Sequence, residues 1–216
     1  MSKYKCIIFD CDGVLIDSET IAIGTLVEMA NLLGANMDKS QSIIDLKGKS
    51  FNHCLNLISN RINKLLPEDF ESEYRVNTFK AFKENIQPIK GIKEVIKNLK
   101  IPFCVASSGP ENKIRLNLEV TGLLPSFEGK IFSCYTIQKW KPEPDVYLWA
   151  AKTMGFKASE CLVIEDSVSG VLGAKNGGFD VYGYTEHDYK NELEVLSTKT
   201  FSKMSDLLGL INNETA

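Results

Sequence analysis

Short apolar runs alternate with longer amphipathic stretches over most of the chain. The runs are rich in β-branched residues and apolar on both faces, as strands of a covered parallel sheet are. Between them, hydrophobic residues recur with helical spacing. The predicted strands are residues 6–9, 103–106, 130–132, 161–164 and 181–184, and the predicted helices are 91–99, 112–120, 144–154 and 168–176. This alternation predicts a doubly wound, Rossmann-like α/β core with a parallel sheet.

One long region after the first predicted strand breaks this alternation. It contains no convincing strand, and helical spacing instead runs through residues 21–33, 51–66 and 68–82. Gly34 ends the first of these segments and Pro67 begins the third. We therefore expect residues 17–87 to form an all-helical domain inserted into an α/β core made of residues 1–16 and 88–216.

The composition limits the classes of partner. With 25 Lys+Arg against 28 Asp+Glu, the net charge of −3 attracts neither nucleic acid nor an anionic membrane. No apolar run approaches the roughly 18 residues that cross a bilayer, and the first residues do not resemble a signal peptide. The six cysteines are spread singly, which fits a reduced, cytoplasmic protein rather than a disulfide framework or zinc site. The modest size makes a monomer the default expectation.

The first predicted strand ends in paired acids. Ligands of such sheets bind at the carboxyl ends of the strands. Asp10 and Asp12 project to the same side of an extended chain, about 7 Å apart, and Gly13 permits a sharp turn after them. Two carboxylates at such a short distance repel each other unless a cation or proton lies between them. An Asx-capped turn is the alternative, whereas an EF-hand is disfavoured because its twelfth position would be Ile21.

The next two motifs carry groups that bind anions. Ser107, Ser108 and Gly109 follow a predicted strand and precede a helix, where hydroxyl and backbone N–H groups form an anion site. An ordinary helix cap is the alternative for this motif. Lys141 is followed directly by Pro142, which restricts its backbone and suits a fixed cation. The alternative for Lys141 is a solvated surface side chain.

The fourth motif adds further carboxylates. Glu165 and Asp166 end an apolar strand, although a helix N-cap by Asp166 or Ser167 with a solvated Glu165 is the alternative. Together the four motifs supply a carboxylate nucleophile, a second acid, an anion cradle, a cation and hard oxygen ligands. Oxygen-rich clusters without His or Cys select Mg²⁺ over zinc. This set suits transfer of a phosphoryl group to an aspartate.

In this order, the motifs resemble those of the haloacid dehalogenase superfamily, in the subgroup with a helical cap after the first strand. The resemblance covers the whole chain: Asp10-x-Asp12-Gly13, Ser107, Lys141-Pro142 and Glu165-Asp166 match the four signatures, and residues 17–87 match the cap. The stretches SSGPENK and IFSCYTIQKWKPEPD are most similar to bacterial phosphosugar or 6-phosphogluconate phosphatases.

The resemblance implies a Mg²⁺-dependent phosphatase that acts on a small phosphate ester. Asp10 would attack phosphorus and form an aspartyl-phosphate, while Asp12 protonates the leaving alcohol and then deprotonates water. The groups that neutralise the phosphoryl oxygens would be Ser107 and Lys141, with the amides of Ser108 and Gly109. The implied metal ligands are Asp10, the backbone carbonyl of Asp12, Asp166, and Glu165 directly or through water.

The cap implied by the resemblance would select the substrate and exclude water. A loop of related caps reaches into the site, and residues 46–50 are the matching stretch here. Lys47 or Lys49 would then contact remote groups of the substrate, unless both are simply exposed lysines.

Three other functions remain open. A phosphosugar mutase shares all four motifs, but such mutases carry a His near the start of the cap where this chain has Ala22. A dehalogenase would lack the second acid, which is present here as Asp12. A non-catalytic phospholigand-binding module on the same scaffold would be expected to have lost Asp10 or its metal partners.

Overall fold

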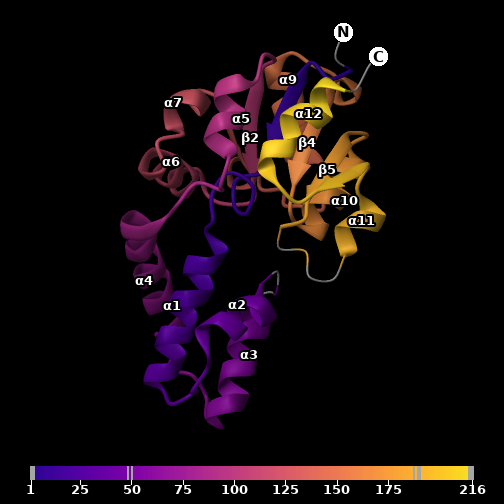
Figure 1. Ribbon diagram of the computed structural model, residues 1–216. Coiled ribbons are helices and arrows are strands. Elements are labelled where there is room, and N and C mark those ends of the chain that lie inside the picture. Colours follow the sequence, from indigo (N-terminus) through magenta and orange to yellow (C-terminus); the bar gives the residue numbers. More distant parts are fainter. Residues whose placement is uncertain (1–2, 48, 50, 187, 189–190, 214–216) are drawn as a thin grey trace. The chain divides into compact units, whose positions relative to one another are not determined.

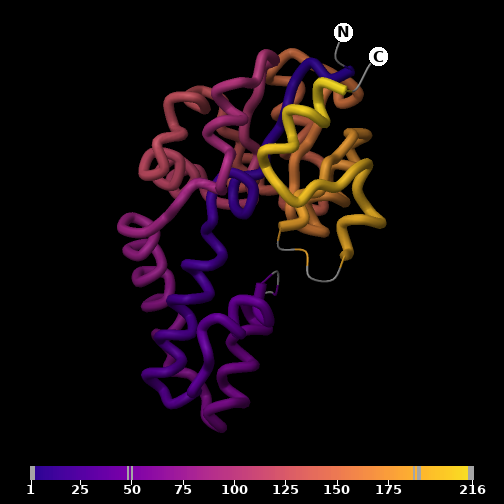
Figure 2. Tube along the Cα trace, in the orientation of Figure 1, coloured from indigo at the N-terminus to yellow at the C-terminus, as the bar shows by residue number. Residues whose placement is uncertain are grey.

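The computed structural model describes residues 3–47, 49, 51–186, 188 and 191–213. The chain forms two compact units, one made of Met1–Ile16 with Gln87–Ala216 and the other of Asp17–Ile86. It leaves the first unit once and returns to it once, so the second unit is an insertion (Figure 2). Within the described part of the chain, no helix is both long and apolar enough to span a membrane.

The first unit contains a six-stranded parallel sheet in the order β3-β2-β1-β4-β5-β6 (Figure 1). The order reverses beside β1, as in a doubly wound sheet, so the predicted fold class is confirmed. The strands are β1 Cys6–Phe9, β2 Phe103–Ser107, β3 Ile131–Ser133, β4 Cys161–Glu165, β5 Asp180–Tyr184 and β6 Lys199–Phe201. The sequence pattern did not predict β6, because this edge strand is three residues long and only Phe201 is buried.

Helices cover both faces of this sheet. On one face, Val146, Tyr147 and Val171 from α9 and α10 pack on the strands in one apolar cluster. On the other face, Phe127 of α7 packs edge to face against Phe9 and Phe103. The helices of this unit are α5 Ile92–Asn98, α6 Glu111–Val120, α7 Leu124–Phe127, α8 Cys134–Ile137, α9 Asp145–Met154, α10 Val168–Asn176, α11 Glu192–Leu196 and α12 Leu207–Asn212, with 3-10 turns η1 Ala158–Glu160 and η2 Met204–Asp206.

The second unit is helical and has its own apolar core, which includes Leu26, Ile58 and Phe70. Its helices are α1 Glu19–Leu32, α2 Lys39–Leu46, α3 Phe51–Ile62 and α4 Phe70–Asn85. The sequence analysis predicted α1, α3 and α4 but not the short α2. A capping signal marks the start of α2, because the Asp38 side chain accepts a hydrogen bond from the Gln41 backbone N–H at 2.7 Å.

Strand register brings the candidate residues to one level of the sheet. Phe9 on the central strand β1 pairs with Val105 of β2 on one side and with Ile164 of β4 on the other. Asp10 directly follows β1 and Glu165 is the last residue of β4, and the Asp10 backbone N–H donates to the Ile164 carbonyl at 2.9 Å. These acids therefore lie side by side at the carboxyl edge, where open α/β sheets bind ligands.

Candidate active site

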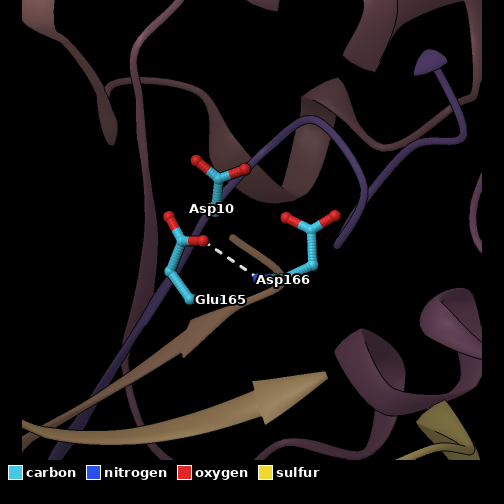
Figure 3. Close-up of side chains that lie close together, drawn as sticks. All are labelled: Asp10, Glu165 and Asp166. Atoms are coloured by element: carbon cyan, nitrogen blue, oxygen red, sulfur yellow. Dashed lines mark hydrogen bonds between the residues drawn. The ribbon is translucent and has the colours of Figure 1, made fainter. Parts of the chain in front are cut away.

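Three carboxylates converge at the ends of β1 and β4 (Figure 3). Each of Asp10, Glu165 and Asp166 offers an oxygen, and these oxygens all lie within 4.8 Å of one another. Asp10 is 7% exposed and Glu165 is 1% exposed, so both are held away from bulk water. A small cluster of hard oxygen donors fits Mg²⁺ better than it fits zinc.

A glycine makes room for this cluster. Gly13 has φ +87°, and a Cβ at this position would lie 1.9 Å from the Asp166 Oδ2 atom. The Gly13 backbone N–H also donates to the Ile16 carbonyl at 2.8 Å, which closes the turn after Asp12. Any other residue here would combine an unfavourable backbone conformation with a collision against Asp166.

Lys141 is buried among the acids. Its Nζ donates to Asp10 Oδ1 at 2.5 Å, to Glu165 Oε1 at 2.7 Å and to the Ala106 carbonyl at 3.2 Å. The Lys141 side chain is only 3% exposed, so the alternative of a solvated lysine is wrong. The peptide bond between Lys141 and Pro142 is cis, and helix α9 begins shortly afterwards.

The Glu165 carboxylate is surrounded by donors. Oε1 accepts from Lys141 and, at 2.8 Å, from the hydroxyl of Tyr147. Oε2 accepts from the backbone N–H groups of Asp166 and Ser167 and from the Ser167 hydroxyl, each at 2.9 Å. Ser167 does cap helix α10, as the structural alternative proposed, but Glu165 is buried rather than solvated. Five donors occupy the lone pairs of this carboxylate.

The charged groups in this cluster shift one another's pKa values. Burial raises the pKa of Asp10 to about 7 despite the opposing charge of Lys141, and the charge of Glu165 adds to the rise. Burial alone would also raise the pKa of Glu165, but the charge and hydrogen bond of Lys141 and the Tyr147 hydroxyl bring it below its usual value. Burial opposes ionisation of Lys141, yet the charges of Asp10 and Glu165 hold its pKa well above the ordinary value. Of Asp10 and Glu165, Asp10 is therefore the acid that holds its proton to the higher pH when no metal ion is bound.

A loop at the end of β2 lies next to these groups. The Gly109 backbone N–H donates to the Ser107 hydroxyl oxygen at 3.1 Å, and the Ser133 hydroxyl donates to the Gly109 carbonyl at 2.6 Å. Ser107 is buried and Ser108 is exposed. The loop leads into helix α6, so it presents hydroxyl and N–H groups at a helix N-terminus, as an anion site requires.

Asp12 has a basic partner. The Nζ of Lys113, in the first turn of α6, lies 3.2 Å from both carboxylate oxygens of Asp12. Burial opposes the charge of Lys113, but the Asp12 carboxylate raises the lysine's pKa above its ordinary value.

The sequence analysis did not predict Lys113, Ser133 or Tyr147 as site residues. The sequence position of Lys113 could have indicated its role. A cation in the first turn of a helix interacts unfavourably with the helix dipole, so its presence there suggests a specific carboxylate partner. Tyr147 occupies an apolar position of α9 and was indistinguishable from a packing residue.

The remaining predicted residues belong to the helical unit. The Lys47 Nζ forms an ion pair with Glu19 Oε2 at 3.3 Å, within that unit. Lys49 is exposed, and its neighbours Gly48 and Ser50 lie outside the described residues. Contact of Lys47 or Lys49 with substrate stays a prediction.

Comparison with known proteins decides the family. The model of the haloacid dehalogenase-like hydrolases matches residues 4–178. The chain belongs to this family. This confirms the resemblance inferred from the motifs, and the chain is accordingly a hydrolase.

Individual relatives agree with this assignment. The chain is 29% identical over 208 residues to the 6-phosphogluconate phosphatase of Escherichia coli, covering 96% of this chain and 94% of that protein. A haloacid dehalogenase-like protein of Agrobacterium tumefaciens superposes with a TM-score of 0.87 at 27% identity, covering 97% of this chain and 98% of its own. A family hydrolase of Deinococcus radiodurans, solved with bound phosphate and sodium, has the same fold, with a TM-score of 0.86 at 23% identity over 99% of this chain and 97% of its own.

Proposed function

We propose that this chain is a Mg²⁺-dependent phosphatase that hydrolyses a small phosphorylated metabolite through an aspartyl-phosphate on Asp10. The observation that carries the proposal is the convergence of a buried nucleophilic carboxylate, a buried lysine and a hydroxyl-amide loop at one sheet edge. Each of these groups suits one requirement of phosphoryl transfer, which depends on positioning and on neutralising charge.

In the proposed reaction, Asp10 attacks phosphorus while the bond from phosphorus to the leaving oxygen breaks. Asp12 donates a proton to that oxygen and becomes a carboxylate. A water molecule then attacks the aspartyl-phosphate, Asp12 takes a proton from the water, and the bond between phosphorus and Asp10 breaks. Free phosphate, the alcohol and the starting enzyme result, so two carboxylates separate the nucleophilic role from the acid-base role.

The proposed cation site uses the carboxylates of Asp10 and Asp166 and the backbone carbonyl of Asp12. Mg²⁺ bound there would supply positive charge next to the phosphoryl oxygens and favour the ionised form of Asp10. Glu165 would act through water and through the groups that it orients, because five donors already occupy its oxygens. Ser107 and Lys141 would neutralise the phosphoryl oxygens, assisted by the amides of Ser108 and Gly109.

The substrate class follows from relatives rather than from the site. The similarity to a 6-phosphogluconate phosphatase supports a phosphosugar or sugar-acid phosphate, and 6-phosphogluconate is the first candidate. The helical unit, residues 17–86 in the structure, would act as the cap that selects among such substrates. Lys47 and Lys49 are the basic side chains of that unit proposed to contact the remote end of the substrate.

The test is release of inorganic phosphate from 6-phosphogluconate, a panel of sugar phosphates and p-nitrophenyl phosphate, with Mg²⁺ and with EDTA. We expect turnover with Mg²⁺ only, and its loss in Asp10→Asn. A β-hexose 1-phosphate belongs in the panel, because isomerisation without phosphate release would identify a mutase instead. Activity that survives either EDTA or Asp10→Asn would contradict the proposal.

A further inference from the structure

The contact between Lys113 and Asp12 has no part in the reaction described so far. Two segments that are 101 positions apart in sequence meet here, and one ammonium nitrogen lies at the same 3.2 Å distance from both carboxylate oxygens. The two side chains are similarly accessible, 28% for Lys113 and 27% for Asp12. A fully exposed ion pair would contribute little to stability. A bridging contact between half-buried side chains, however, restricts how the Asp12 carboxylate can rotate.

Lys113 projects from a firmly fixed helix turn. The preceding loop is tied to β3 by the hydrogen bond from Ser133 to the Gly109 carbonyl at 2.6 Å. Directly after Lys113, Ile114 is 1% exposed and Leu118 is fully buried, so α6 is anchored in the core by its apolar face. The lysine therefore starts from a rigid base, as a residue that orients another side chain needs to.

The carboxylate of Asp12 faces the anion loop. A Cβ built on Gly109 would lie 3.7 Å from Asp12 Oδ2 and 3.5 Å from the Ser107 hydroxyl oxygen, so these two groups flank the same point of the loop. The buried lysine of the carboxylate cluster, Lys141, is engaged with Asp10 and Glu165. The contact with Lys113 is thus placed to orient Asp12 toward the loop.

We infer that Lys113 is a positioning residue that holds the Asp12 carboxyl group over the Ser107–Gly109 loop for both proton transfers, the first from the protonated acid and the second to the carboxylate. This inference rests on the proposed function. Proton transfer needs the acid within about 2.6–3.2 Å of the reacting oxygen, and Asp12 must meet that condition twice, first at the leaving oxygen and then at water. A carboxylate that rotates freely would satisfy it for only part of the time.

Substrates with different leaving groups can distinguish a positioning role of Lys113 from simple binding of the phosphoryl group. p-Nitrophenolate departs without a proton, whereas an alkyl alcohol needs one from Asp12. The constant kcat/KM reports the steps up to release of the alcohol or phenol, and kcat also includes hydrolysis of the aspartyl-phosphate. We therefore expect Lys113→Met to lower kcat/KM about tenfold or more for an alkyl phosphate, within the 10²–10⁴-fold that a positioned acid contributes.

For p-nitrophenyl phosphate the expected result differs. In Lys113→Met, kcat/KM should change by less than about twofold, while kcat falls because Asp12 no longer activates water efficiently. Rapid mixing should then show a burst of p-nitrophenolate as the aspartyl-phosphate accumulates. Lys113→Arg, which keeps a cation, should recover part of the loss for the alkyl ester.

The matched control is Arg115→Met on the same helix. Arg115 pairs with Glu128 at 2.8 Å, and the change removes one positive charge from α6 without touching Asp12. Its kinetics should equal those of the wild type for both esters. The alkyl ester is 6-phosphogluconate, or the sugar phosphate from the panel that the wild type hydrolyses fastest.

Two results would overturn the inference. Equal losses of kcat/KM for both esters would mean that Lys113 binds the phosphoryl group, and unchanged kinetics for both would mean that it has no role. A wild-type enzyme that hydrolyses neither ester with Mg²⁺ would instead refute the proposed function itself. If Lys113→Met fails to fold, the ratio of the two kcat/KM values in Lys113→Arg decides, since a residue that positions the acid alters that ratio.

Discussion

The buried carboxylate of Asp10 should reduce the stability of the metal-free protein, and Asp10→Asn should restore it. Burial raises the pKa of Asp10 from 3.8 to about 7. At 1.36 kcal/mol per pH unit, the difference of about 3 corresponds to about 4 kcal/mol by which ionised Asp10 opposes folding above pH 7. Asn is neutral and retains an acceptor for Lys141. We therefore expect Asp10→Asn to raise the free energy of unfolding at pH 8 by up to about 4 kcal/mol.

The sign of the pH dependence follows from the same shift. The folded state holds the Asp10 proton to higher pH than the unfolded state does, so the associated stability is complete below pH 3.8 and is lost as the pH rises through about 7. Between pH 5 and pH 7 the metal-free wild type should lose about 2 kcal/mol, because Asp10 is already half ionised in the folded state at pH 7. The pKa of Glu165 is lowered and that of Lys141 is raised well above 10.5, so neither titrates in this window.

The assay is urea unfolding in EDTA at pH 5, 6, 7 and 8. Both tryptophans, Trp140 and Trp149, belong to the unit that contains Asp10, so their fluorescence reports on the relevant unit. Asp206→Asn replaces an exposed acid of the same unit and serves as the control, with a pH dependence like that of the wild type. If the wild type and Asp10→Asn lose stability in parallel from pH 5 to pH 8, the assignment of the proton to Asp10 is wrong.

Three further predictions concern the cation site and its supports. Since Mg²⁺ and a proton compete for Asp10, Mg²⁺ affinity measured by calorimetry should fall about tenfold for each pH unit below 7, and a constant affinity would contradict this competition. Gly13→Ala should abolish measurable Mg²⁺ binding because its Cβ would lie 1.9 Å from a site carboxylate oxygen, whereas Gly155→Ala, with a similar φ of +84° and no atom within 4 Å, should lose only about 1–2 kcal/mol of stability. Tyr147→Phe removes one donor from buried Glu165 and should lower kcat severalfold with little change in KM, and a change confined to KM would exclude a role in orienting the catalytic groups.

The core architecture was predictable because it depends on patterns that persist over many residues. Five of the strands are apolar runs that the sheet buries almost completely, and three of the four motifs lie at the ends of β1, β2 and β4, whereas Lys141 follows β3 only after the short helix α8. Once these strands are parallel and adjacent, their carboxyl ends meet, so the proximity of Asp10 to Glu165 needed no knowledge of side-chain packing.

Other parts of the site depend on contacts that no local pattern encodes. Lys141 could be expected near phosphate, but its contacts with both Asp10 and Glu165 depend on the loop between β3 and α9. Tyr147 has a hydroxyl that reaches Glu165 only because α9 packs across the sheet. The short elements β6 and α2 were missed because three to eight residues are too few for periodicity to identify.

The charges of the cluster explain why Asp10, the proposed nucleophile, can be buried at all. Asp10, Glu165 and Asp166 carry three negative charges when ionised, and Lys141 supplies one positive charge, which leaves −3 + 1 = −2. A divalent cation would balance this charge, while without one the cluster reduces it by holding a proton on Asp10. The proton and the ion are therefore alternative ways to stabilise the same buried carboxylate, and only the ion leaves Asp10 ionised for the proposed attack on phosphorus. The raised pKa of Asp10 is then a consequence of the charge that the proposed divalent ion would balance, rather than a property that catalysis has to overcome.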